Sequence, residues 1–144
     1  MIDIDVIEEA TKKNTEQPER KHEVFACDNF YDSLDRHQAT IPDLDDKVSD
    51  FVKFKQANPD SNKNRWPHGT DEHMGSDGHW KKVPKLKHAS LGFDMRIFYT
   101  IEGNQIKLYG VHPHDESGTG NPKNPRKQEA LAKKMSKQKF EPYE

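Results

Sequence analysis

The sequence has few hydrophobic residues and almost no cysteine. Hydrophobic residues make up 31% of the 144 positions, whereas ordinary globular domains contain about 45–50% apolar residues. A core built from this composition is small and is surrounded by polar segments or long loops. The single cysteine, Cys27, excludes an internal disulfide and a cysteine-based zinc cluster, and it is typical of a reducing compartment.

Long apolar runs are also absent. No segment approaches the roughly 18 consecutive apolar residues that a membrane-spanning helix needs. The first residues, MIDIDVIEEA, are acidic, whereas a secretory signal would be basic and then apolar. We therefore expect a single-domain cytoplasmic protein without a membrane partner.

The common short catalytic motifs are missing as well. The absence of a Walker loop, of G-x-S-x-G, of H-E-x-x-H and of C-x-x-C argues against P-loop nucleotide hydrolysis, the α/β-hydrolase mechanism and the usual zinc sites. Metal-ligating residue types do occur together, but their spacing matches no compact ligand pattern: His68, His73, His79, His88, Asp71 and Asp77. We expect neither a metal nor a cofactor.

What is present is a division of charge. The formal net charge is −2, yet residues 1–60 carry 15 acidic and 8 basic side chains, and residues 61–144 carry 10 acidic and 15 basic. The second half is therefore basic by five charges. Such asymmetry favours a polyanionic partner for the basic half, the alternative being two surfaces that are merely solvated.

Hydrophobic spacing predicts a strand and two helices in the first half. The apolar run at residues 22–27 ends at an N-cap pair, residues 28–29, which indicates a strand that leads into a helix. A second helix is expected to begin after residues 41–43 and to end near residues 58–59. Its stripe repeats at helical spacing and consists of Leu44, Val48, Phe51, Val52 and Lys55.

The second half begins with a long loop, residues 60–79, which is rich in Gly, Asn, Asp and His. Residues 94–101 and 105–111 alternate like two strands of a hairpin. In the second strand the alternation predicts one face made of Ile106, Leu108 and Gly110, and an opposite face made of Lys107, Tyr109 and Val111. A basic helix is expected over residues 126–139.

Together these segments predict an acidic arm, residues 1–22, followed by one domain, residues 23–144. The fold class is α+β. We expect a small antiparallel sheet with two N-terminal helices packed on one face, the other face open, and a basic C-terminal helix.

The residues around the hairpin have the chemistry that RNA cleavage requires. A general base takes the 2′-hydroxyl proton, a general acid protonates the departing 5′-oxygen, and cations stabilise the charge on the phosphorane. Histidine suits both proton transfers near neutral pH, and Lys and Arg suit the third task. The candidate catalytic residues are His112, His114, Arg96, Lys87 and Lys85. The alternatives are solvated histidines at a strand end and a structural ion pair of Arg96 with Asp94 or Glu116.

Basic residues of the second half are the candidates for RNA binding. We expect seven of them to contact RNA: Lys81, Lys82, Lys123, Arg126, Lys127, Lys133 and Lys134. A solvated helix face is the alternative for those in the C-terminal helix. Four aromatic residues could stack on bases, but packing in the core is the stronger expectation for the two within a strand: Trp66, Trp80, Phe98 and Tyr99.

The arrangement resembles the RelE/ParE toxin superfamily, and most of all its YafO-type and RelE-type ribosome-dependent mRNA interferases. Four features carry this resemblance: the helix ending FVKFKQANP at residues 51–59, the KLK run at 85–87, the two hairpin strands, and the HPHD segment at 112–115. The likeness covers about residues 23–135. The arm and the long loop are not part of the usual compact toxin.

The resemblance implies a RelE-like fold and a metal-independent endoribonuclease that is the toxin of a toxin–antitoxin system. Its expected partners are mRNA and ribosomal RNA in the ribosomal A site and a protein antitoxin. The active site would consist of Lys85, Lys87, Arg96 and His112 or His114. Two alternatives stay open: a non-enzymatic member that binds a protein target such as gyrase, and an RNA- or ribosome-binding regulator.

Overall fold

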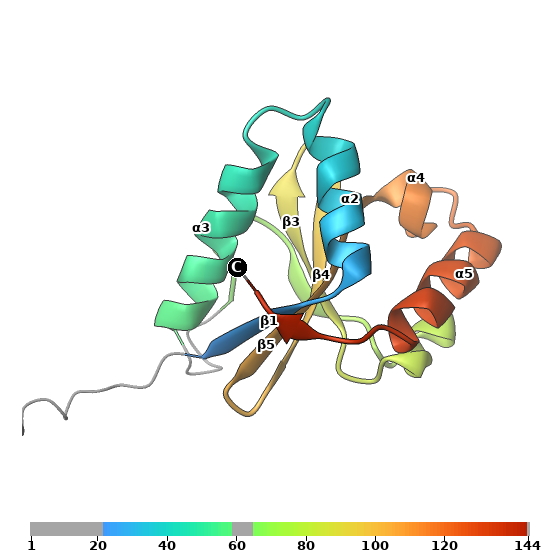
Figure 1. Cartoon of the computed structure of the whole chain (residues 1–144). Coiled ribbons are helices and arrows are strands. Elements are labelled where there is room, and N and C mark those ends of the chain that lie inside the picture. The colour runs from blue at the N-terminus through green and yellow to red at the C-terminus, as the bar shows by residue number, and fades with distance from the viewer. Residues whose placement is uncertain (1–21, 59–64, 144) are drawn as a thin grey trace, which may run out of the picture.

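The computed structural model describes residues 22–58 and 65–143. Residues 1–21 of the predicted acidic arm and residues 59–64, most of which belong to the predicted long loop, lie outside the described residues. Figure 1 shows a sheet with helices on both sides of it. In chain order the elements are β1 (Glu23–Ala26), α2 (Asp28–Gln38), α3 (Leu44–Ala57), β2 (Asp71–His73), the 3-10 helix η1 (Gly78–Lys82), β3 (Lys87–Gly92), β4 (Met95–Glu102), β5 (Gln105–Pro113), α4 (His114–Ser117), α5 (Pro125–Ser136) and β6 (Glu141–Pro142).

The six strands form one sheet in the order β2-β3-β4-β5-β1-β6. Neighbouring strands are antiparallel except β1 and β5, which run parallel. The α+β class is thus confirmed, with a sheet that is mainly antiparallel. β1 and β5 are about eighty residues apart in the sequence and are not joined by a hairpin, so they are free to pair in parallel.

One face of the sheet packs against α2 and α3. The stripe predicted for the second helix is buried there, because Leu44, Val48 and Phe51 are fully covered and share a core with Ile97 and Leu108 of the sheet. Edge-to-face contacts join the Phe51 ring to neighbouring aromatic rings. This face contains the larger of the two cores.

The opposite face is covered too, so the prediction of an open face is wrong. Trp80 of η1 stacks on Phe98 of β4, with 5.7 Å between ring centroids, and Leu131 and Met135 of α5 complete a second core with Tyr109. The Trp80 indole nitrogen donates a hydrogen bond to the Gln128 side chain (3.1 Å). The low apolar content is therefore divided between two small cores.

The predicted long loop also contains regular structure. β2 lies between residues 65 and 79 and pairs with β3, and η1 begins at Gly78. Sequence periodicity missed β2 because a three-residue edge strand with the polar sequence DEH shows no hydrophobic alternation. In the described part of the chain, no helix has the length and apolar character that a membrane crossing needs.

The strand β5 departs from regular alternation at Tyr109. Phe98 pairs with Gly110 and Tyr99 pairs with Leu108, so Tyr109 is an extra residue, a β-bulge. Val111 consequently joins the core beneath α2 and α3 together with Leu108. Lys107 and Tyr109 share a face as predicted, but the predicted faces of Gly110 and Val111 are wrong for this reason.

A buried ion pair joins α3 to β2. The Lys55 ammonium donates to the Asp71 carboxylate (2.6 Å), and both side chains are almost completely buried. The same carboxylate accepts hydrogen bonds from the Trp66 backbone (2.6 Å) and from the Tyr99 hydroxyl. Burial lowers the pKa of Lys55, and the Asp71 carboxylate opposes that shift.

We expect Lys55→Met to lower the free energy of unfolding by about 3–5 kcal/mol, because it leaves a buried carboxylate without its cation. Urea denaturation measures this value. Lys53→Met is the matched control, since Lys53 is exposed on the same helix, and it should change stability by about 0.5 kcal/mol or less. Equal stabilities for the two variants would contradict the proposed importance of the ion pair.

Candidate functional site

The candidate site is built around His112, close to the end of β5. Because of the bulge at Tyr109, His112 lies on the same face of the sheet as its cross-strand partner Arg96. The His112 side chain is 2% exposed, and its ring meets the Phe98 ring edge to face at 5.8 Å. The histidine is therefore held in a defined orientation by packing.

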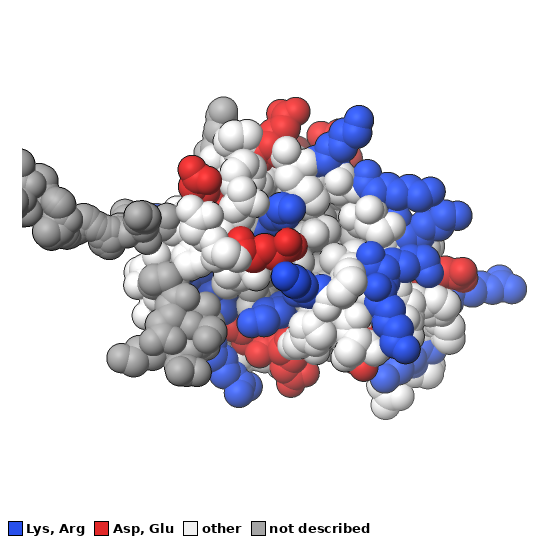
Figure 2. Space-filling model, turned by 90° about the horizontal axis from the view of Figure 1, so that it is seen from below, with Lys and Arg blue, Asp and Glu red and all other residues white. Residues whose placement is uncertain are grey.

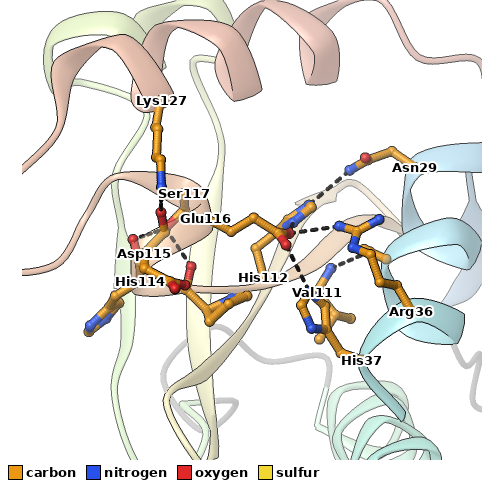
Figure 3. Close-up of polar contacts among 12 residues, drawn as sticks. Asn29, Arg36, His37, Val111, His112, His114, Asp115, Glu116, Ser117 and Lys127 are labelled. Atoms are coloured by element: carbon orange, nitrogen blue, oxygen red, sulfur yellow. Dashed lines mark hydrogen bonds and ion pairs between the residues drawn. The ribbon is translucent and has the colours of Figure 1, made fainter. Parts of the chain in front are cut away.

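Hydrogen bonds fix the protonation of the His112 ring (Figure 3). Nδ1 lies 2.6 Å from the Glu116 carboxylate, and Nε2 lies 3.1 Å from the Asn29 Nδ2. Asn29 Nδ2 also donates to the Tyr109 carbonyl oxygen (2.7 Å), which identifies this atom as the amide nitrogen. Nε2 must then accept a hydrogen bond while Nδ1 donates to Glu116, so the imidazole is neutral.

A glycine makes this arrangement possible. A Cβ atom at Gly110 would lie 2.5 Å from both the Asn29 Nδ2 and the His112 Nε2. Real Cβ atoms do not approach other heavy atoms so closely. Only glycine at this position leaves room for the amide to reach the imidazole.

Glu116, in the short helix α4, accepts from three side chains of two other elements. Arg36 of α2 donates at 2.7 Å and His37 lies at 3.1 Å, in addition to His112. Burial alone would raise the pKa of Glu116, but the hydrogen bonds from His112, Arg36 and His37 outweigh it and hold that pKa far below its usual value. The carboxylate thus stays charged and ties α2, β5 and α4 together.

The pKa of His112 is lowered, which agrees with the neutral ring that its hydrogen bonds indicate. Burial lowers it, and the nearby Glu116 carboxylate opposes this effect without reversing it. The neutral imidazole, with a lone pair on Nε2, is therefore the form present at neutral pH. This is the form that a general base needs.

His112 forms part of the wall of a pocket of about 270 Å³ between α2, β5, α4 and α5. We call it the His112 pocket. Three cationic side chains surround it, Arg36, Lys127 and Lys134, and α5 also contributes an apolar wall. The Lys127 ammonium donates to the Asp115 carbonyl oxygen (2.5 Å). Basic residues around a neutral histidine suit an anionic substrate, such as a phosphodiester.

The five candidate catalytic residues do not all meet. Arg96 lies beside His112, and its buried Nε has no hydrogen-bond partner among the described residues. Neither ion pair that sequence reasoning offered for Arg96 is found in the described chain: Asp94 pairs with His114 (3.1 Å) and Glu116 with the donors named above. His114 begins α4 and points away from His112 in Figure 3.

The two lysines of the KLK run lie elsewhere. Lys87 pairs with Tyr99 in the sheet and shares its face, the side of α3, opposite to Arg96. Lys85 lies in a separate cleft with Lys82. The expectation that both lysines converge with Arg96 and His112 is wrong, because residues 85 and 86 precede β3 and strand alternation directs Lys87 to the other face.

Of the seven predicted RNA-binding residues, two reach the His112 pocket, namely Lys127 and Lys134. The others are exposed: Lys81, Lys82, Lys123, Arg126 and Lys133. Figure 2 shows Lys and Arg side chains gathered over the side of the molecule on which α5 lies. The helix α5 begins at Pro125, and its first turn is capped by the Asn124 side chain, which accepts from the Lys127 backbone.

Sequence reasoning missed Asn29 and Arg36 of α2 and the role of Glu116. Glu116 follows His112 by four residues, a spacing that could have suggested a pair. Asn29 was noticed only as a helix cap, and no local signal connects it with a residue more than eighty positions away. The stacking roles considered for Trp80, Phe98 and Tyr99 are not available in this structure, because all three side chains are buried.

A further histidine, His88, lies on the same face of the sheet as Arg96 and pairs with Phe98. Sequence reasoning included His88 only in the metal candidate set. Burial lowers the pKa of His88, and the nearby Arg96 lowers it further. Within residues 22–58 and 65–143, no group of His, Cys, Asp and Glu side chains could hold a metal ion.

The fold occurs in a toxin of known structure. A crystal structure of a copper-bound mutant toxin from Helicobacter pylori has a TM-score of 0.50 and 14% sequence identity, with 66% of this chain and 97% of that chain covered. At this identity the likeness is one of fold alone. No protein-family model matches the sequence, and no curated protein matches it.

The lowered pKa of His112 predicts a pH-dependent stability. Below pH 6.5, the usual value for histidine, the unfolded chain takes up a proton that the folded chain refuses, so the free energy of unfolding falls as the pH falls. His112→Asn, which keeps a donor toward Glu116, should weaken this dependence in the window above pH 4.5, where carboxylates contribute little.

Urea denaturation at several pH values measures the effect. His88→Asn should remove a further part of the slope, and the double variant should have a shallower slope than either single variant. A slope unchanged in His112→Asn would show that the imidazole titrates normally in the folded protein.

Proposed function

We propose that this protein is a toxin of the RelE/ParE kind, a ribosome-dependent mRNA endoribonuclease, and that a protein antitoxin normally inhibits it. The observation that carries the proposal is the His112 pocket, in which a neutral imidazole is oriented by Glu116 and surrounded by cations. The fold that the chain has in common with a Helicobacter pylori toxin supports the toxin class.

In the proposed reaction, His112 Nε2 takes the proton of a ribose 2′-hydroxyl. The hydroxyl would replace Asn29 as the donor to this nitrogen. The 2′-oxygen attacks phosphorus, the bond to the 5′-oxygen breaks, and the products are a 2′,3′-cyclic phosphate and a 5′-hydroxyl. The departing oxygen takes its proton from solvent.

The other groups of the pocket have electrostatic roles. Glu116 stabilises the imidazolium that forms when His112 accepts the proton. Lys127 and Lys134, which line the pocket, are placed to offset the charge that develops on the phosphorane, and Arg96, the cross-strand neighbour of His112, adds to the local positive charge. Arg36 holds Glu116 in position and is a positioning residue. No metal is needed for this chemistry, because lysine and arginine side chains supply the positive charge.

One observation favours a second candidate, an RNA- or ribosome-binding protein that does not cleave. Both nitrogens of the His112 ring are already hydrogen bonded, and the side chain is 2% exposed. A histidine in such a position can serve the structure alone. In that case the basic surface of α5 would bind RNA and His112 would only hold the helices together.

Mapping 5′ ends of cellular mRNA after induction in a bacterium distinguishes the two. We expect cuts in phase with codons that depend on translation, and a loss of at least about 10²-fold in cleavage for His112→Asn, because asparagine cannot transfer the proton. His37→Asn is the matched control, since it removes another donor to Glu116 and should leave cleavage within a few-fold of the wild type.

A wild type that binds RNA and leaves the message intact would support the second candidate. Full cleavage by a folded His112→Asn variant would contradict the assignment of the base. Growth arrest with intact mRNA and broken DNA would instead indicate a protein target such as gyrase.

A further inference from the structure

A second basic cleft lies apart from the His112 pocket and has no role in the proposed reaction. It has a volume of about 360 Å³. Three lysines from different segments surround it: Lys82 at the end of η1, Lys85 before β3, and Lys107 in β5. We call it the lysine cleft. Its single acidic residue is Glu102.

Within the part of the chain that the structure describes, none of the three lysines forms an ion pair, in contrast to Lys55, which is paired with Asp71. Like charges that meet around a concave surface repel one another, and an anion in the cleft would relieve that repulsion. The charge pattern therefore indicates an anionic ligand.

The floor of the cleft adds an aromatic surface. Tyr109 and Phe140 meet edge to face at 4.7 Å between ring centroids, and the Lys107 ammonium lies 5.5 Å from the Phe140 ring centroid. Tyr109 is buried, and the half-buried Phe140 ring is the one that a ligand can reach. A cleft of this size that combines cations with this ring suits one nucleotide of a single strand, whose phosphate binds lysine while its base meets Phe140.

The lysine cleft and the His112 pocket are neighbours across α5. Lys134 lines the His112 pocket, and the next residue, Met135, lines the lysine cleft. In β4, Arg96 and Thr100 lie on one face, four residues or about 13 Å apart. Lys133 of α5 and Lys137, directly after its end, are exposed as well. The C-terminal end of α5 thus carries further basic side chains near both clefts.

We propose that the lysine cleft binds a flanking nucleotide of the same RNA strand whose scissile phosphodiester occupies the His112 pocket. This inference rests on the proposed function and assigns a second binding site to the substrate. Lys82, Lys85 and Lys107 contact the phosphate of that nucleotide. The cleft contributes to affinity and takes no part in the bond-breaking step.

The test compares two charge reversals in the full chain. Lys85→Glu changes the lysine cleft, and Lys53→Glu changes the net charge equally at an exposed position on α3. Binding of a single-stranded RNA long enough to span both clefts is measured against salt concentration. Lys85→Glu should make the slope of log K against log salt shallower by about 0.7, the value for one lost phosphate contact in a single strand.

A triple variant, Lys82→Gln, Lys85→Gln and Lys107→Gln, should also lower the slope by about 0.7, because the three lysines bind one phosphate. Cleavage of mRNA on translating ribosomes should proceed at the wild-type rate when the triple variant is saturating, whereas cleavage at low protein concentration should fall. This split separates a flanking site from a catalytic one.

The possible failures can be told apart. If the wild type binds the long RNA and Lys85→Glu behaves like Lys53→Glu, the lysine cleft is not a binding site, while the proposed function stands. If the folded triple variant loses ribosomal cleavage even when it is saturating, the lysines act in the reaction and the inference is wrong. If the wild type neither binds the long RNA nor cleaves mRNA on ribosomes, both proposals fail.

Discussion

One extra residue in β5 determines which side chains of this strand lie on each face of the sheet. The bulge at Tyr109 reverses the alternation of the strand, so that His112 lies on the face of Arg96 while Val111 enters the larger core. With regular alternation, His112 would instead point beneath α2 and α3. Gly110 beside it gives the Asn29 amide its path to the imidazole. The candidate site depends on this local irregularity.

The His112 pocket also shows how a buried histidine keeps a reactive nitrogen. A carboxylate with a full charge beside an imidazole normally favours the imidazolium. Here Arg36 and His37 share the Glu116 carboxylate, and the Asn29 amide offers Nε2 a donor, so burial prevails and the ring stays neutral. Tyr109 fixes the amide in turn, because its carbonyl oxygen accepts the other Asn29 hydrogen. The Tyr109 carbonyl oxygen, in the bulge, thus helps to keep the His112 imidazole neutral.

Strong periodic signals made much of the fold predictable. The stripe from Leu44 to Lys55 and the hairpin of β4 and β5 were expected within a few residues of their observed bounds. The edge strands β2 and β6 are too short and polar to show periodicity, and the pairing of β1 with β5 joins segments about eighty residues apart. A bulge leaves no trace in composition, so the faces of β5 beyond Tyr109 were predicted wrongly.

The sequence indicated which types of residue the site contains, but not how they are arranged. Arg96 lies on a regular part of β4, so its face follows from the alternation of that strand. Lys87 lies on the opposite face of the sheet, because strand alternation separates it from Arg96 even though the KLK run is short. Asn29 and Arg36 reach the site only through packing of α2, which no nearby residue in the sequence indicates.

The contribution of α5 has a consequence for the protein during its own synthesis. The buried residues of the larger core and the strands that position His112 precede α5 in the sequence, but Lys127, Lys134 and the apolar wall of the pocket come from α5. A nascent chain that has not yet been made as far as α5 therefore presents the histidine with Arg36 as the one cation among the described residues that line the pocket. The pocket takes shape only after that helix has left the ribosome.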